Sequence, residues 1–182
     1  MALITLGATK VDHMVADAAA RCARTPVQTA LKAITLAGDE HALLGLAAGI
    51  WLASRAGSSR LRRKTDYLTL NVIVSAIVPH LLKRLVDQRR PDRLVHGTRH
   101  GIPKSGNADD AFPSGHALHI GALAAAISRT FPRSAGLAWT AGSVVAATRV
   151  LLLAHWLTDV LAGLAAGAAL EHLLAALWPP RK

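Results

Sequence analysis

Three short polar segments in an otherwise apolar chain carry the side chains best suited to chemistry. The first segment, KRLVDQRRP, runs from Lys83 to Pro91 and holds two cations, Lys83 and Arg90. On a helix, their seven-residue spacing would place both cations on one face, and Pro91 would end the helix. Two cations that face one point can bind an anionic group. Taken alone, the segment also fits a basic flank that contacts lipid headgroups.

The second segment, Pro113-Ser114-Gly115-His116, stands directly before an apolar run. Pro113 and Ser114 can cap a helix there, and Gly115 lets an anion approach the free backbone N–H groups of the first turn. Such a helix N-terminus attracts phosphate, and His116 would stand beside it. Taken alone, the tetrapeptide also fits a helix cap followed by a histidine without a chemical role.

The third segment, TRVLLLAHWLTD, contributes Arg149, His155 and Asp159. His155 and Asp159 are four residues apart, so on a helix the carboxylate can accept a hydrogen bond from one imidazole nitrogen while the other points away. Such a pair supports a nucleophile or a base. Ionisable side chains inside an apolar segment are costly, and we treat them as functional by default.

The apolar segments between these motifs predict membrane-spanning helices. The chain has 182 residues, of which 52% are hydrophobic and only 4% aromatic, and its many small residues suit helices that pack closely in lipid. The predicted spans are Ala42–Ser54, Tyr67–Leu82, Ala111–Ser128 and a longer region, Ser134–Trp178. As one helix, this last region would be about 67 Å long, roughly twice the ~30 Å hydrocarbon core. We therefore expect it to reverse within Arg149–Asp159, which gives five crossings.

The pentapeptide GLAAG occurs twice, at Gly45–Gly49 and Gly163–Gly167. Each copy forms a Gly-x-x-x-Gly face of the kind that brings helices together in membranes. Chance in a chain rich in Ala and Gly explains the repeat about as well.

Residues 1–37 predict helices of a different kind. Within residues 1–24, Val11, Met14 and Val15 recur with helical spacing among charged residues, which is typical of an amphipathic helix at the membrane interface. A second, short helix is expected from Thr25 to Ala37. The predicted fold class is therefore all-α, an integral membrane helical bundle of five to six helices with an amphipathic N-terminal helix. We divide it into N-terminal interfacial helices, 1–37, and a single membrane-embedded core, 38–182.

Counting the crossings brings the three polar segments together. The second span ends at Lys83, the third begins at Pro113, and the turn between the fourth and fifth contains His155. All three segments should therefore lie on one side of the bilayer. A phosphoryl group carries close to two negative charges and develops more during transfer, and cations and backbone N–H groups stabilise that charge. The combined site predicts a phosphate group as its ligand.

The three motifs together resemble the tripartite signature of the type 2 phosphatidic acid phosphatase superfamily, with every spacing from Lys83 to Asp159 intact. Thr148 stands where this family often has serine. The resemblance implies that His155 attacks phosphorus to form a phosphohistidine, that Asp159 orients it, and that His116 protonates the leaving lipid oxygen and later helps to activate water. It assigns phosphate binding to five residues: Lys83, Arg90, Arg149, Ser114 and Gly115. It implies neither a metal ion nor another cofactor.

The activity implied by this resemblance is that of an integral membrane phosphatase acting on a lipid phosphate monoester or pyrophosphate. Phosphatidic acid, phosphatidylglycerophosphate and polyprenyl diphosphate are all open as substrates. We expect the loop Asp92–Ala111 to select the headgroup, because it contains Gly, Pro and several basic residues. The expected partners are the membrane lipid substrate and the phospholipid bilayer. The expected location is the bacterial inner membrane, as a multi-pass protein with its site on the extracytoplasmic side.

Two other functions fit parts of the same sequence. A noncatalytic membrane protein could bind or carry anionic lipids through the same basic cleft. A metal-dependent hydrolase could use one set of ligands: His116, His119, His155 and Asp159. The spacing of that set matches no familiar metal motif. Nucleic-acid binding is not expected despite the net charge of +10, because the basic residues cluster between apolar segments without interleaved aromatic residues. Sequence alone assigns no role to three ionisable residues beside the motifs: His80, Asp109 and Asp110.

Overall fold

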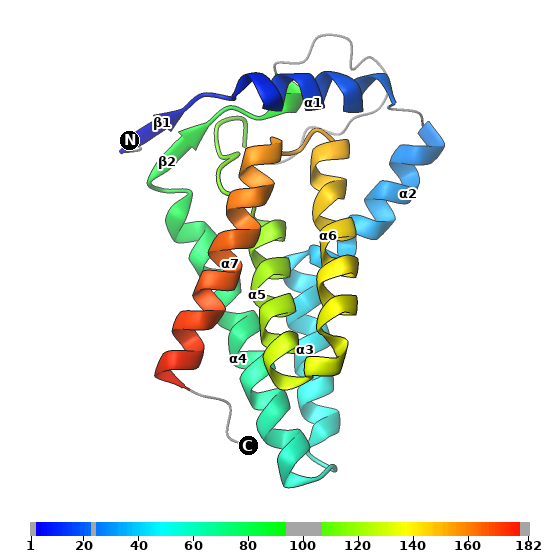
Figure 1. The fold of residues 1–182 in the computed structure, drawn as a ribbon, viewed down its shortest axis with the longest axis vertical. Coiled ribbons are helices and arrows are strands. Elements are labelled where there is room, and N and C mark those ends of the chain that lie inside the picture. The colour runs from blue at the N-terminus through cyan, green and yellow to red at the C-terminus, as the bar shows by residue number, and fades with distance from the viewer. Residues whose placement is uncertain (1–2, 23–24, 94–106, 179–182) are drawn as a thin grey trace.

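The computed structural model describes residues 3–22, 25–93 and 107–178, and these residues are mostly helical (Figure 1). In chain order, the helices are α1 (Lys10–Arg21), α2 (Thr25–Thr35), α3 (Glu40–Ser54), α4 (Ser59–Leu82), α5 (Gly115–Thr130), α6 (Ala135–Leu151) and α7 (Leu157–Leu177). The other elements are two strands, β1 (Ile4–Leu6) and β2 (Val86–Gln88), and three short 3-10 helices at Leu36–Gly38, Pro91–Arg93 and Pro132–Ser134. The all-α prediction is confirmed, because α3 to α7 form the bundle and α1 and α2 precede it.

Two of the bundle helices are long and apolar enough by themselves to cross a membrane. These are α4, with 24 residues, and α7, with 21 residues. The other three, α3, α5 and α6, have 15, 16 and 17 residues, or about 22–26 Å of helix. The predicted reversal of the last apolar region is confirmed, because α6 ends at Leu151 and α7 begins at Leu157.

Helix α5 lies at the centre of the bundle, in contact with α4, α6 and α7 (Figure 1). Most of its side chains are buried, and many of them are alanine. It packs backbone to backbone on α7: a Cβ atom on Gly121 would collide with the backbone of Leu164, and one on Gly167 would collide with the backbone of Leu118. Such close approach requires glycine. These contacts hold the N-termini of α5 and α7 next to each other.

Only one of the two GLAAG copies packs in this way. Gly163 and Gly167 both meet the backbone of α5. By contrast, a Cβ atom on Gly45 or Gly49 of α3 would have no atom of the described chain within 4 Å. The second copy is therefore a helix-packing face, and the first makes no such contact in the part of the chain that the structure describes.

The opposite end of the bundle is tied together by a buried carboxylate. Glu171 on α7 is fully buried, and its Oε1 accepts hydrogen bonds from the Tyr67 hydroxyl of α4 and from Nε of Arg129 on α5, both at 2.6 Å. A buried charge is tolerated when it is paired and hydrogen-bonded in this manner. The network joins three helices away from the polar motifs.

The prediction of a helix through Lys83–Pro91 is wrong. Helix α4 ends at Leu82, and the chain then turns into β2, which pairs in parallel with β1. The backbone N–H groups of this segment bond to residues that are distant in the chain. Those of Gln88 and Arg90 donate to the carbonyls of Asp109 (2.8 Å) and Ala108 (2.9 Å). The two cations of this segment therefore do not share a helical face.

The amphipathic N-terminal helix is present, but it begins later than the sequence suggested. Strand β1 occupies Ile4–Leu6, and α1 begins at Lys10, where Thr9 and Asp12 form a capping box. Helix α1 lies across the end of the bundle that carries the N-termini of α5 and α7 (Figure 1). The division into residues 1–37 and 38–182 stays a prediction.

The glycine contacts predict different outcomes for two alanine substitutions. Gly167→Ala would force α5 and α7 apart, so we expect it to lower the free energy of unfolding by about 1–3 kcal/mol. Gly49→Ala is the matched control in the other GLAAG copy, and its better helix propensity should leave stability unchanged or raise it by up to ~1 kcal/mol. Thermal unfolding of the two proteins in detergent measures the difference. Equal loss of stability in both variants would contradict the assigned packing face.

Candidate active site

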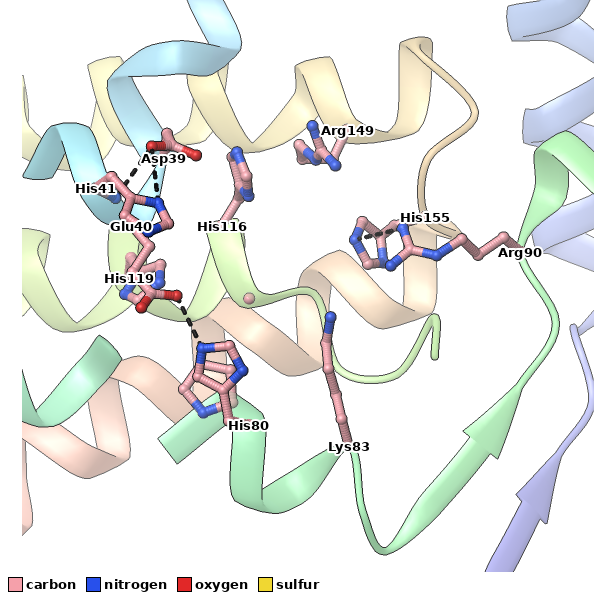
Figure 2. Close-up of a pocket in the computed structure, with 12 residues that line it drawn as sticks. Asp39, Glu40, His41, His80, Lys83, Arg90, His116, His119, Arg149 and His155 are labelled. Carbon is pink, nitrogen blue, oxygen red and sulfur yellow. Dashed lines mark hydrogen bonds and ion pairs between the residues drawn. The ribbon is translucent and has the colours of Figure 1, made fainter. Parts of the chain in front are cut away.

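A pocket of about 230 Å³ opens at the end of the bundle where the three polar segments meet (Figure 2). Six of the residues predicted for the site line it: Lys83, Arg90, Gly115, His116, Arg149 and His155. The remaining lining residues are Asp39, Glu40, His41, Pro79, His80 and His119. The structure thus brings side chains from all three segments together, as counting the crossings predicted.

Arg90 is almost completely buried and contacts both His155 and Asp110. Its Nη1 lies 3.3 Å from Nε2 of His155 and donates to the carbonyl oxygen of Ala154 at 2.9 Å. Its Nε and Nη2 donate to Oδ1 of Asp110 at 3.0 and 2.6 Å. The other carboxylate oxygen of Asp110 accepts from Nζ of Lys83 at 3.4 Å. One carboxylate therefore holds two of the cations in place.

The third cation, Arg149, reaches the pocket from α6. Its Nη1 donates to the hydroxyl of Thr35 at the end of α2 (3.2 Å), and its buried Nε has no hydrogen-bond partner among the described residues. Unlike Arg90 and Lys83, it forms no ion pair with a carboxylate in those residues. A guanidinium with unused donors beside two other cations favours an anionic ligand.

His155 lies in the turn between α6 and α7 and is buried. Its Nδ1 lies 2.7 Å from the carbonyl oxygen of Ala111, which can only accept, so Nδ1 carries the proton and donates it. Nε2 therefore presents its lone pair towards Arg90. Burial holds the pKa of His155 well below its usual range, and the charge of Arg90 and of the other two cations lowers it further. The imidazole is neutral at pH 7, with Nε2 free of a proton.

The hydrogen bond predicted between His155 and Asp159 is not formed. Nδ1 of His155 and Oδ2 of Asp159 are 3.7 Å apart, which is too far for a hydrogen bond. The prediction placed both residues on one helix, but α7 begins only at Leu157. Oδ2 of Asp159 instead accepts from the backbone N–H of Trp156 at 2.9 Å. Asp159 fixes the turn that carries His155, and the Ala111 carbonyl fixes the imidazole.

The Pro-Ser-Gly-His segment begins α5 as predicted. Ser114 is the N-cap, and its Oγ accepts from the backbone N–H of Ala117 at 3.4 Å. Its own backbone N–H donates to the carbonyl of Asp159 (3.2 Å), which ties the start of α5 to the start of α7. Ser114 is fully buried and is not among the residues that line the pocket, so its contact with phosphate stays a prediction. Figure 2 shows the His116 side chain between Asp39 and Arg149.

One wall of the pocket comes from residues to which sequence reasoning assigned no role. Glu40 Oε2 lies 2.9 Å from Nε2 of His80, which links the start of α3 to the end of α4. Asp39 lies beside Glu40 as the N-cap of α3. In the sequence, these carboxylates simply flank an apolar segment. Only the position of α3 beside α4 shows that they face the cations.

The ligand set of the metal-dependent alternative is not assembled as a metal site. Among residues 3–22, 25–93 and 107–178, no group of three His, Cys, Asp or Glu side chains is placed to hold a metal ion. His119 contacts the hydroxyl of Ser75 (3.3 Å), and Asp159 is engaged by Trp156. The expected independence from metal stays a prediction.

The loop expected to select the headgroup, Asp92–Ala111, lies outside the described residues at positions 94–106. Its described end supplies two groups to the site: the Asp110 carboxylate, which holds Arg90 and Lys83, and the Ala111 carbonyl, which accepts from His155.

The chain matches the PAP2 superfamily over residues 65–182, a region that contains all three motifs. It belongs to the PAP2 superfamily. Two similar relatives are both named lipid A 1-phosphatase. That of Rhizobium johnstonii is 33% identical over 182 residues, covering 91% of this chain and 74% of the relative. That of Rhizobium etli is 31% identical over 181 residues, covering 90% of this chain and 78% of the relative.

Two solved structures share the fold of this PAP2 protein. One is the transmembrane PAP2 type phosphatidylglycerolphosphate phosphatase of Bacillus subtilis, with a TM-score of 0.65 and 20% identity, covering 91% of this chain and 83% of that one. The other is LpxE of Aquifex aeolicus, with a TM-score of 0.66 and 12% identity, covering 91% of this chain and 94% of that one. The predicted family and the membrane bundle are confirmed. Membership of this phosphatase family also confirms the predicted enzyme class over noncatalytic lipid binding.

The charge of Lys83 predicts how activity depends on pH. Burial lowers the pKa of Lys83, and the Asp110 carboxylate opposes this by raising it. Asp110→Asn removes the opposing charge, so Lys83 should lose its proton at lower pH and the site should then lose a cation. We expect the alkaline limb of the kcat/KM profile to move to lower pH.

Asp109→Asn is the matched control for this experiment, because Asp109 is exposed and lies 4.0 Å from the cation of Arg89. It should leave the alkaline limb in place. An Asp110→Asn profile that superimposes on the wild-type profile would show that Asp110 does not set the charge of Lys83.

Proposed function

We propose that this PAP2 protein hydrolyses a phosphate monoester of a glycolipid and releases inorganic phosphate, with His155 as the nucleophile and without a metal ion. One observation carries the proposal. A neutral imidazole presents Nε2 to a pocket lined by three cations, with Arg90 at 3.3 Å and with Lys83 and Arg149 beside it. A neutral imidazole is nucleophilic, and cations stabilise the charge that develops on the phosphoryl oxygens.

The reaction proceeds in two steps. Nε2 of His155 attacks phosphorus. His116 is protonated once the negative charge of the bound phosphate offsets the nearby cations, and it donates this proton to the leaving lipid oxygen as the bond between that oxygen and phosphorus breaks. The lipid leaves as an alcohol, and the phosphoryl group remains on His155. His116, now neutral, takes a proton from a water molecule whose oxygen attacks phosphorus. The phosphorus–nitrogen bond breaks, inorganic phosphate leaves, and His116 is protonated again.

The cations act at different points of this path. Arg90 donates towards Nε2 of His155, and an entering phosphate would draw these donors onto its own oxygens and release the lone pair for attack. Lys83 and Arg149 bind the remaining phosphoryl oxygens, with the backbone N–H of Gly115 at the start of α5. Asp159 acts through the turn that it caps, so its effect on His155 is indirect.

Two observations support a glycolipid as the substrate class. The relatives that are 33% and 31% identical are named for a phosphatase acting on lipid A. In addition, the carboxylates of Asp39 and Glu40 line the same pocket as the cations. Carboxylates accept hydrogen bonds from sugar hydroxyl groups, whereas a polyprenyl diphosphate has no hydroxyl on its carbon chain to offer them.

We place the site on the extracytoplasmic side of the inner membrane. Seven basic residues gather at the other end of the bundle: Arg55, Arg60, Arg62, Arg63, Lys64, Arg129 and Arg133. Lys and Arg are enriched on the cytoplasmic side of membrane proteins. Cys22 is exposed at the end of α1, on the site side. Its labelling by a membrane-impermeant maleimide on intact spheroplasts supports this orientation, and its protection contradicts it.

His155→Ala should lower the rate of phosphate release by more than about 10³-fold, because it removes the imidazole whose Nε2 lies beside Arg90 and attacks phosphorus. His172→Ala is the control, since His172 is an exposed histidine near the other end of α7, and it should keep wild-type turnover. Wild-type activity should survive treatment with EDTA. Turnover by the His155→Ala variant would overturn the nucleophile, and loss of activity in EDTA would overturn metal independence.

Glu40→Ala should raise the KM for a phosphorylated glycolipid by roughly tenfold, because a hydrogen bond to a charged acceptor is lost. The same variant should keep its KM for phosphatidic acid, which has no sugar to contact Glu40. Steady-state kinetics with both lipids in mixed micelles measures the two values. An equal rise for both lipids would remove Glu40 from substrate selection.

A further inference from the structure

A buried carboxylate on the N-terminal helix is bonded to the first turn of α7, directly after His155. Asp12 of α1 is only 1% exposed. Its Oδ1 accepts from the backbone N–H of Thr158 at 2.9 Å, and its Oδ2 accepts from the hydroxyl of Thr158 at 2.8 Å. Oδ2 also accepts from the backbone N–H and the hydroxyl of Thr9, at 2.9 and 2.8 Å. A single side chain therefore joins two elements that are 146 residues apart.

These bonds complete the cap of α7. The first N–H groups of a helix have no partner within the helix and need an acceptor from elsewhere. The N-cap residue is Trp156, whose side chain has no oxygen to accept them. Asp159 accepts from the N–H of Trp156, and Asp12 accepts from that of Thr158. A carboxylate at this end also interacts favourably with the helix dipole. The turn that contains His155 thus ends in a cap that α1 helps to build.

Apolar contacts of α1 surround the same turn. Ala16 and Ala19 on its buried face form one cluster with Ala111, Leu153 and Trp156. Ala111 is the residue whose carbonyl orients the imidazole of His155. Leu153 and Trp156 lie on either side of His155 in the chain.

The ring of Trp156 is held from two sides. The His13 ring of α1 meets it edge-on, with 5.0 Å between ring centroids. Nε1 of Trp156 donates to the carbonyl oxygen of Arg89 at 2.7 Å, and Arg89 precedes Arg90 in the chain. Trp156 therefore connects α1, through His13, to the segment that carries Arg90.

Asp12 is ionised at neutral pH. Burial raises the pKa of this carboxyl group, but the hydrogen bonds from Thr158 and Thr9 outweigh that effect and hold the pKa below its usual range. Full negative charge strengthens each of its four hydrogen bonds.

We propose that Asp12 is a positioning residue and that α1 is a clamp that holds the turn of His155 in line for attack on phosphorus. The inference rests on the proposed nucleophilic role of His155. Asp12 touches neither the substrate nor the reacting atoms, so it acts only through the first turn of α7. A small displacement of a nucleophile from its attack geometry lowers the rate strongly while leaving binding of the phosphate to the cations intact.

The test compares Asp12→Asn with Asp17→Asn, because Asp17 is an exposed carboxylate on the same helix. Asp12→Asn keeps the size of the side chain but removes its charge and one acceptor oxygen. We expect its kcat to fall by about 10- to 100-fold, with little change in the inhibition constant of inorganic phosphate, which reports the cation site. Asp17→Asn should match the wild type in both values.

Two results would overturn the inference. One is an unchanged kcat in Asp12→Asn. The other is a parallel loss of kcat and of phosphate inhibition, which would mean general damage to the site. If Asp12→Asn does not fold, Thr158→Val serves instead, because it removes one of the four hydrogen bonds of Asp12. It should lower kcat by roughly 2- to 10-fold and leave the inhibition constant of inorganic phosphate unchanged. The same two results in Thr158→Val would overturn the inference. Turnover by His155→Ala, measured alongside, would instead refute the proposed function.

Discussion

The site depends on keeping three cations beside a neutral imidazole at one end of an apolar bundle. Like charges repel, and burial makes each charge less stable. Asp110 offsets the charge of Arg90 and Lys83, and Nε of Arg149 has no hydrogen-bond partner in the part of the chain that the structure describes. A phosphate group, which carries close to two negative charges, completes the charge balance. Burial lowers the pKa of His155, and the same positive charge lowers it further, so the cations both attract the substrate and help to keep the nucleophile unprotonated.

Helix packing determines where these groups stand. Gly121, Gly163 and Gly167 let α5 and α7 touch through their backbones. The start of α5 is then close enough for the N–H of Ser114 to reach the carbonyl of Asp159. The early end of α4 has a comparable effect, because β2 carries the chain away from Lys83 and lets Arg90 approach from a different direction (Figure 2). The cations surround the pocket because they come from three elements with different directions.

The sequence was sufficient for those features that depend on apolar length and on local spacing. Apolar runs of membrane length fix the order of the helices, and the order of crossings alone brings Lys83, His116 and His155 to one end. The early end of α4 could not be predicted, because nothing in Lys83–Arg90 breaks a helix and the strand that replaces it is stabilised by β1, some eighty residues away. The hydrogen-bond partner of His155 could not be predicted for a related reason. Its imidazole donates to a backbone carbonyl, and every residue has one. Asp12 is the extreme case, since an aspartate near the start of a helix is common and its bond to Thr158 exists only in the folded chain.

The central claim is a covalent bond between phosphorus and Nε2 of His155, and rapid quenching during turnover tests it most directly. Enzyme mixed with a ³²P-labelled lipid phosphate, quenched in alkali and digested, should yield one acid-labile labelled peptide that contains His155. The same treatment of His155→Ala should yield none. Full turnover by the wild type with no label on His155 at any quench time, or with label on another residue, would contradict the account.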